Sequence, residues 1–206
     1  MILATDSALV TELKRLQVGF SVTPDPAVVF FPFRLRKLSL GLFHHFPHDF
    51  ISSLFISSAS TLVNLSIPVC EGTNHYPVVT QLYPIISARI QRLSVIYDDP
   101  SGRFGQLMRN CAHLRRLDWD GLWGQLAQFL STIPQSLEKF SAIIRLDDGD
   151  ALEILISCFD LVALSHVRRI KIKLEGIGWE EVVGNAGFEE TCAERGVALV
   201  LVEVER

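Results

Sequence analysis

The residues with the clearest potential for chemistry are three histidines and an aspartate within six positions, His44, His45, His48 and Asp49. Imidazole and carboxylate groups are suitable ligands for transition metals. The segment nevertheless lacks a helical His-Glu-x-x-His frame and a fourth ligand at a telling distance. Asp49 also stands where a carboxylate stabilises the first turn of a helix. We therefore predict no metal site, and a metal-dependent enzyme that uses these four side chains stays the less favoured alternative.

A second acidic run spans residues 147–150, with the sequence DDGD. It is too short for a twelve-residue calcium loop and lacks that loop's distal glutamate. Asp150 is followed three residues later by Glu153, which is the spacing of a helix-capping pair. We predict that Asp150 caps a helix.

Four cysteines, Cys70, Cys111, Cys158 and Cys192, are separated by 41, 47 and 34 residues and form no Cys-x-x-Cys motif. This spacing predicts reduced thiols in an intracellular protein, cytoplasmic or nuclear. The N-terminus has no signal-peptide pattern, and no apolar run reaches the roughly 18–20 residues of a membrane span. No nucleophile is paired with a base, so we expect neither catalytic residues nor a cofactor.

One hexamer, apolar-x-x-apolar-x-apolar, recurs along the chain, for example as LRRLDW at residues 114–119. Its seven copies begin at Leu13, Leu35, Leu62, Ile90, Leu114, Leu137 and Val167. The starts are 22 to 30 residues apart, close to the roughly 20–29 residues of a leucine-rich repeat. The hexamers are therefore predicted to be short strands of a repeat protein.

Segments with helical spacing separate the hexamers. They are residues 49–59, 77–89 (interrupted by Pro84), a segment after Asp99 and Pro100, 122–133, 151–164, and 179–195 before Gly196. Because each helix returns the chain in the same direction, the strands must be parallel. We predict one α/β domain over residues 1–206, a leucine-rich-repeat solenoid of seven to eight repeats. The sheet would be concave and the helices convex, with residues 197–204 as a terminal strand and 1–12 as a candidate cap.

The amino-acid sequence of the predicted repeats resembles a known family. Cys111 three residues before Leu114, followed by Leu-x-x-Leu-x-Trp, resembles the leucine-rich repeats of F-box proteins. Residues 49–67 and 192–204 resemble the divergent repeats of fungal F-box-type proteins. The resemblance implies a non-enzymatic module that recognises substrates for a ubiquitin ligase.

Two features depart from that family. The ninth repeat position, usually Asn or Cys, holds Ser21, Phe43, Cys70, Asp98, Leu122, Arg145 and Glu175. No F-box is visible before residue 13, so a ubiquitin-ligase adaptor is expected as a partner only if an F-box exists outside this chain.

Basic residues occupy fixed positions of the hexamer. Because side chains alternate along a strand, the first, fourth and sixth residues should enter the core, while the second, third and fifth face the concave side or its rim. Six of the seven third positions are Lys or Arg, and the second and third positions together hold 10 of the chain's 19 basic residues. The candidate partner-binding residues are Arg15, Lys37, Arg92, Arg115, Arg116, Lys139, Arg168, Arg169 and Lys171.

A column of like charges on a chain of net charge -4 calls for a ligand or for compensating acids. We predict that the column binds an acidic or phosphorylated protein, because arginine contacts such groups in a bidentate way. Three alternatives stay open: a merely solvated sheet face, a stand-alone scaffold, and a degenerate fragment without a ubiquitin-ligase role. Nucleic acid is not favoured, because aromatic residues do not alternate with the basic ones, and Trp119 is expected in the core.

Overall fold

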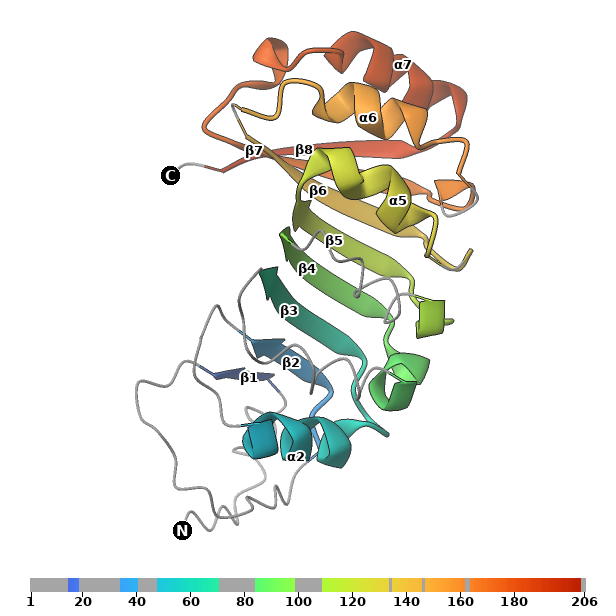
Figure 1. Ribbon diagram of the computed structural model, residues 1–206. Helices are drawn as coiled ribbons and strands as arrows, with labels where there is room; N and C mark the ends of the chain where they lie inside the picture. The colour runs from blue at the N-terminus through green and yellow to red at the C-terminus, as the bar shows by residue number, and fades with distance from the viewer. Residues whose placement is uncertain are drawn as a thin grey trace.

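The computed structural model describes residues 15–18, 34–40, 48–70, 84–98, 109–133, 135–145, 147–161 and 164–204. Eight strands form one sheet in chain order, and every neighbouring pair is parallel (Figure 1). The strands are β1 (Arg15–Val18), β2 (Lys37–Leu40), β3 (Asn64–Cys70), β4 (Arg92–Asp98), β5 (Arg116–Gly121), β6 (Lys139–Arg145), β7 (Arg169–Glu175) and β8 (Ala198–Val204). The protein is therefore α/β with an all-parallel sheet.

The hexamers coincide with the strands. Each of β1 to β7 begins at the third residue of a hexamer, and the register pairs equivalent positions in adjacent strands. At the start of the β2–β3 pairing one carbonyl accepts two hydrogen bonds: the N–H groups of Val63 and Asn64 both donate to Arg36 O, at 2.9 and 3.0 Å. The predicted strand 197–204 is also confirmed, as β8 pairs with β7 along its length.

Helical segments lie on one side of the sheet (Figure 1). They are α2 (His48–Ser58), η1 (Ser87–Arg89), η2 (Trp123–Gln125), α5 (Leu126–Leu130), α6 (Ala151–Ser157), η4 (Trp179–Glu181) and α7 (Asn185–Glu194). The other side, which we call the open face, carries the third and fifth residues of each hexamer and the residues two and four positions after the fifth. No helix in the described part of the chain has the length and apolarity to cross a lipid bilayer.

Several predicted helices are shorter than expected. Residues 151–164 form a helix only as far as Ser157, and the segment 179–195 is divided by Gly184, whose φ of 82° is left-handed. Gly196, at φ 65°, follows the end of α7 as predicted. Pro84 opens a helical turn that leads into η1, while residues 1–12, 77–83 and 99–108 lie outside the described residues.

The predicted capping role of Asp150 is confirmed in position only. Asp150 is the N-cap residue of α6, but its side chain makes no capping hydrogen bond. Asp148 organises the turn instead, because its Oδ2 accepts from the Arg145 N–H at 2.8 Å and its carbonyl accepts from the Ala151 N–H at 3.1 Å. The carboxylate of Asp148, rather than that of Asp150, therefore satisfies a backbone N–H group of this turn.

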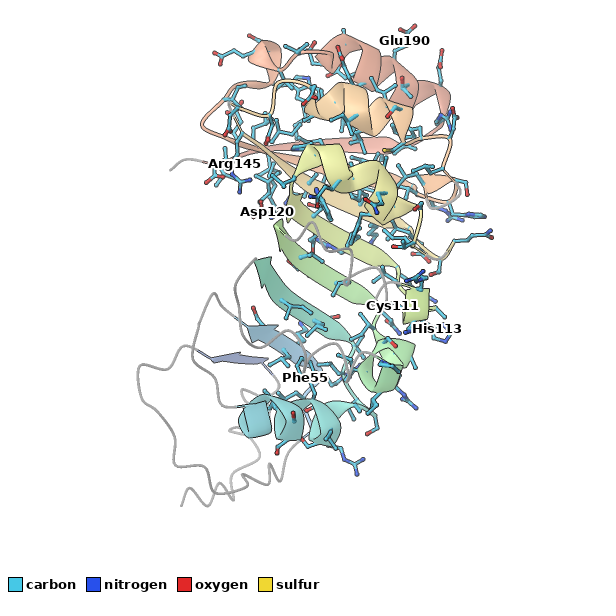
Figure 2. All side chains as sticks on the ribbon, in the orientation of Figure 1. Phe55, Cys111, His113, Asp120, Arg145 and Glu190 are labelled. Carbon is cyan, nitrogen blue, oxygen red and sulfur yellow. The ribbon has the colours of Figure 1, made fainter. Side chains whose placement is uncertain are left out.

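The core lies between the sheet and the helices, on the hexamer positions that were predicted for it. The first, fourth and sixth residues of the described repeats are buried; they include Leu35, Leu38, Leu62, Leu65, Ile67, Ile90, Leu93, Val95, Leu114, Leu117, Trp119, Leu137, Phe140, Ala142, Val167, Ile170 and Ile172. Trp119 is 1% exposed, and its ring centroid lies 4.4 Å from that of Phe129 in α5. Phe55 of α2, which is labelled in Figure 2, is also fully buried by its exposed area.

Hydroxyl groups tie neighbouring repeats together. The buried Ser58 Oγ accepts from the Leu35 N–H at 3.1 Å, and Thr61 Oγ1 donates to Leu35 O at 2.9 Å. Ser136 Oγ donates to Leu114 O at 2.8 Å in the equivalent place three strands further along the sheet. These bonds satisfy backbone groups at the start of a strand, where an unpaired polar group would destabilise the fold.

We expect Leu117→Ala to lower the free energy of unfolding by about 2–5 kcal/mol, because it opens a cavity in a fully buried column between Leu93 and Phe140. Leu122→Ala is the matched control, since Leu122 is 50% exposed and should cost less than about 0.5 kcal/mol. Urea denaturation followed by circular dichroism measures both. Equal costs for the two substitutions would contradict this description of the core.

Candidate protein-binding surface

The predicted basic column forms a row across the open face that only Asn64 interrupts among the described strands. The register pairs Arg15 with Lys37, Lys37 with Asn64, and so on through Arg92, Arg116, Lys139 and Arg169. Adjacent strands of a sheet lie about 4.8 Å apart, so consecutive members are near neighbours. Among those with described side chains, Lys37, Arg92, Lys139 and Arg169 are exposed and Arg116 is half-buried, while the side chain of Arg15 lies outside the described residues.

The remaining candidates flank this row. Arg115 and Arg168 are exposed and precede β5 and β7, while Lys171 is half-buried at the fifth position of its repeat. Arg115 Nε lies 3.8 Å from Glu138 Oε1, and both side chains are largely exposed. Such a pair contributes little to stability, so Arg115 stays available to a ligand.

Asp118 changes the electrostatics of the row at its centre. Its Oδ2 accepts from Arg92 Nε and Nη2, both at 2.9 Å, and its Oδ1 accepts from Arg116 Nε at 3.1 Å and Nη2 at 3.0 Å. Asp118 is buried between the two guanidinium groups, which lie on adjacent strands. One carboxylate therefore relieves the repulsion between two arginines and holds both in place.

A second ion-pair group closes the carboxyl ends of the strands. Arg145 Nη2 donates to Asp120 Oδ1 at 2.8 Å, and Arg145 Nε donates to Glu175 Oε2 at 2.9 Å (Figure 2). Partial burial alone would lower the pKa of Arg145, but the hydrogen bonds and charges of the two carboxylates outweigh it and raise the pKa. Arg145 and Glu175 are the ninth residues counted from the starts of their hexamers, and they lie opposite each other in the register of β6 and β7.

Four cations on β6 and β7 lack such compensation. Lys139, Arg169, Lys171 and Lys173, which we call the β6–β7 patch, form no ion pair with any carboxylate of the described residues. They lie on the open face in adjacent strands, with Lys139 directly opposite Arg169. The exposed Arg168 lies beside them at the start of β7. The strongest uncompensated positive charge of the described sheet is therefore near its C-terminal end.

Sequence reasoning missed three parts of this surface: the clamping role of Asp118, the membership of Lys173, and the bridge made by Arg145. Alternation could have found Lys173, because it lies two residues beyond Lys171 and therefore on the same face. The Asp118 clamp was partly visible in the two-residue separation from Arg116. The partners of Arg145 come from strands 25 and 30 residues away, and no local pattern connects them.

The predicted histidine cluster lies largely outside the described residues. His44 and His45 lie outside the described residues, and of His48 and Asp49 only the backbone, at the start of α2, is described. Within the described residues, no three His, Cys, Asp or Glu side chains are grouped to hold a metal ion. The prediction that Asp49 stabilises a first helical turn agrees with its position as the second residue of α2.

Three of the four thiols are buried and free: Cys111, Cys158 and Cys192. Burial raises the pKa of Cys111 to about 12, and burial together with the charge of Glu189 raises the pKa of Cys192 to about 11. Burial also raises the pKa of Cys158, despite the hydrogen bond from Ser157. A thiol must ionise to act as a nucleophile, so these three behave as apolar core residues.

We expect Asp118→Asn to lower the free energy of unfolding by about 1–2 kcal/mol, because two arginines lose their shared anion while half-exposed guanidinium groups discount the loss. The loss should shrink in 0.5 M salt, which screens the remaining repulsion. Glu138→Gln is the control and should change the free energy by less than about 0.5 kcal/mol, since that pair is long and exposed. Urea titrations at two salt concentrations decide, and equal costs would contradict the clamp.

The buried Cys111 should make stability fall at alkaline pH. Its pKa is about 12 in the folded protein against 9.0 for a free thiol. Below pH 9 both states keep the proton, whereas above it only the unfolded state loses it. The stabilising contribution is therefore complete below pH 9 and is lost as the pH rises toward 12, by about 1.4 kcal/mol per pH unit.

Unfolding free energies of the wild type and Cys111→Ala between pH 8 and pH 10.5 should diverge in slope, with the shallower slope in the variant. Ile90→Val, a change in an equally buried residue without a titratable group, should keep the wild-type slope. Identical slopes in the wild type and Cys111→Ala would contradict the assignment.

No protein-family model matches the chain, and no curated protein matches it either. The resemblance to F-box leucine-rich repeats therefore depends on the residues quoted above and stays a prediction.

Proposed function

We propose that the protein is a leucine-rich-repeat solenoid without catalytic activity, whose concave face binds an acidic or phosphorylated segment of another protein. Three features support this reading: hexamers in matching register, a parallel sheet in chain order, and helices on one side. Stacked units of this kind bury one continuous core and leave the opposite face of the sheet free for a ligand.

The observation that carries the proposal is the contrast between the centre and the C-terminal end of the open face. At the centre, Asp118 compensates Arg92 and Arg116. On β6 and β7 the described residues supply no such acid, although Ser141, the equivalent of Asp118 on β6, stands where one would fit. Uncompensated neighbouring cations repel one another, and an anionic partner would relieve that repulsion.

The geometry of the β6–β7 patch suits an extended acidic segment. Arg169, Lys171 and Lys173 are two residues apart on one strand, so they repeat every ~6.6 Å, which matches alternate side chains of an extended peptide. Lys139 extends the patch sideways onto β6. Arginine can grip a carboxylate or phosphate with two donors, while lysines act as point charges.

The resemblance to F-box proteins would make this surface a receptor for ubiquitin-ligase substrates. That role needs an F-box outside this chain, whereas a stand-alone scaffold needs only the concave face. Both versions use the same surface, so the same binding experiment supports either of them.

A triple charge reversal tests the proposal. Lys139→Glu, Arg169→Glu and Lys171→Glu together should weaken binding of a fluorescent peptide of alternating Glu and Ser by about tenfold or more, because three favourable contacts become repulsive. The matched control reverses Arg34, Arg89 and Arg109, which are exposed and lie outside the sheet. It changes the net charge equally and should alter affinity less than twofold at physiological salt.

The comparison is made by fluorescence polarisation, with a second peptide that carries phosphoserine. Affinity capture from lysate with the same three proteins should show acidic partners lost only in the β6–β7 variant. If both triple variants lost peptide affinity equally, the loss would be due to net charge alone, and the β6–β7 patch would not be a specific binding site. Preferential binding of single-stranded oligonucleotide would replace the protein-binding proposal with a nucleic-acid one.

A further inference from the structure

The outer edge of β8 is unpaired in the described part of the chain. β8 pairs with β7, and the Ala198 N–H donates to Arg168 O at 2.9 Å. Backbone groups alternate along a parallel strand, so the N–H and C=O groups of Leu199, Leu201 and Glu203 point away from β7. This row of donors and acceptors can be satisfied fully by another extended backbone.

A groove runs beside this edge, between α7 and β8. It has a volume of about 310 Å³ and is lined by Glu189, Cys192, Ala193, Val197, Leu199 and Leu201. Leu201 is 36% exposed, and on the open face Ala198, Val200, Val202 and Val204 are also incompletely covered. A strand added at the edge would cover apolar surface on both faces of the sheet.

Charge restricts what that strand can be. Residues 176–204 contain six glutamates and a single basic residue, Arg195, which is paired with Asp160 at 2.6 Å. Glu203 lies on the edge strand itself, and Glu189 lines the groove, where its Oε1 accepts from Trp179 Nε1 at 2.7 Å. Glu190 projects outward from α7 (Figure 2). A segment that carries Lys or Arg beside its apolar residues therefore complements this end, whereas a second copy of β8 and α7 would bring glutamates together.

We propose that the edge of β8 binds an extended, alternately apolar and basic segment of a second protein, which adds to the sheet as a ninth strand. The backbone edge requires the extended conformation, the groove takes the apolar side chains, and the glutamates select the basic ones. β8 contains neither proline nor lysine, and Glu203 is its one charged residue, so a basic segment would not be repelled from this edge. This site is separate from the β6–β7 patch and of opposite charge preference.

The test uses two synthetic peptides, alternating Leu with Lys and alternating Leu with Glu, added to the intact protein. The Leu-Lys peptide should bind at least tenfold more tightly, and it should slow amide exchange at Leu199, Leu201 and Glu203 but not at Val200 and Val202, which already face β7. Exchange is read by two-dimensional NMR. Equal affinity of the peptides, or protection spread over the whole strand, would overturn the proposal.

Two substitutions separate the backbone contribution from the side-chain contribution. Leu201→Pro removes an N–H that points to the open edge and spares the ladder with β7, a position at which sheets tolerate proline. Leu201→Pro should lower the affinity for the Leu-Lys peptide at least tenfold. Leu201→Ala, which keeps the N–H, should lower that affinity about threefold. Circular dichroism confirms that both variants are folded, and equal losses in the two would overturn the ninth-strand geometry.

Controls keep this proposal distinct from the concave-face function. The triple reversal of Lys139, Arg169 and Lys171 should leave binding of the Leu-Lys peptide within twofold, and Glu203→Lys should weaken it. Sedimentation should show that the protein alone does not dimerise through β8. Self-association that Leu201→Pro abolishes would assign the edge to a second copy and overturn the proposed partner.

Discussion

The structure depends on the shared register of a parallel backbone ladder with three buried apolar positions in each strand. A parallel strand cannot slip by one residue without moving its core side chains to the open face. The burial of the first, fourth and sixth hexamer positions therefore fixes which residues face outward. The charged row is a consequence of that constraint. Leu93, Leu117 and Phe140 have to align to share the core, and the residues just before them, Arg92, Arg116 and Lys139, therefore align on the open face.

This constraint forces like charges together, and the sheet responds differently along its length. At the centre an aspartate two residues after Arg116 lies on the same face and clamps two strands. At the carboxyl ends of β5, β6 and β7, Arg145 joins two acids. On the open face of β6 and β7 the fifth positions are Ser141 and Lys171, and no described acid takes the corresponding place. The difference between the centre and the β6–β7 patch depends on one position, the fifth residue of the hexamer: an aspartate there neutralises the neighbouring arginines, whereas a serine or lysine does not.

The sequence allowed the strands, their order and the burial of the hexamers to be predicted, because a fixed spacing of leucines reports directly on one face of a strand. The helices were less predictable. The segment 179–195 is divided where Gly184 takes a left-handed conformation, and Asp148 rather than Asp150 organises the turn before α6. In the candidate site, the basic row followed from alternation, but the partners of Arg145 did not, since residues 25 and 30 positions away meet only after the strands are stacked. Patterns within a short stretch of sequence predict which side chains share a face of the sheet. Ion pairs between strands also depend on how distant strands are stacked.

The same alternation produces two surfaces of opposite character at one end of the sheet. On β7 the open face is basic, whereas β8 presents Ala198, Val200 and Val202 opposite Arg169, Lys171 and Lys173, so the cations end in an apolar border. Beyond that border, Glu203 lies on the edge strand and Glu189 of α7 lines the groove beside it, where the backbone edge is unpaired among the described residues. An acidic ligand on the patch would be repelled from the edge, and a basic strand on the edge would be repelled from the patch. An acidic ligand on the patch would neutralise the cations that repel a basic strand, and a basic strand on the edge would neutralise the glutamates that repel an acidic ligand. Each ligand would therefore favour binding of the other, because coupling between two sites is reciprocal.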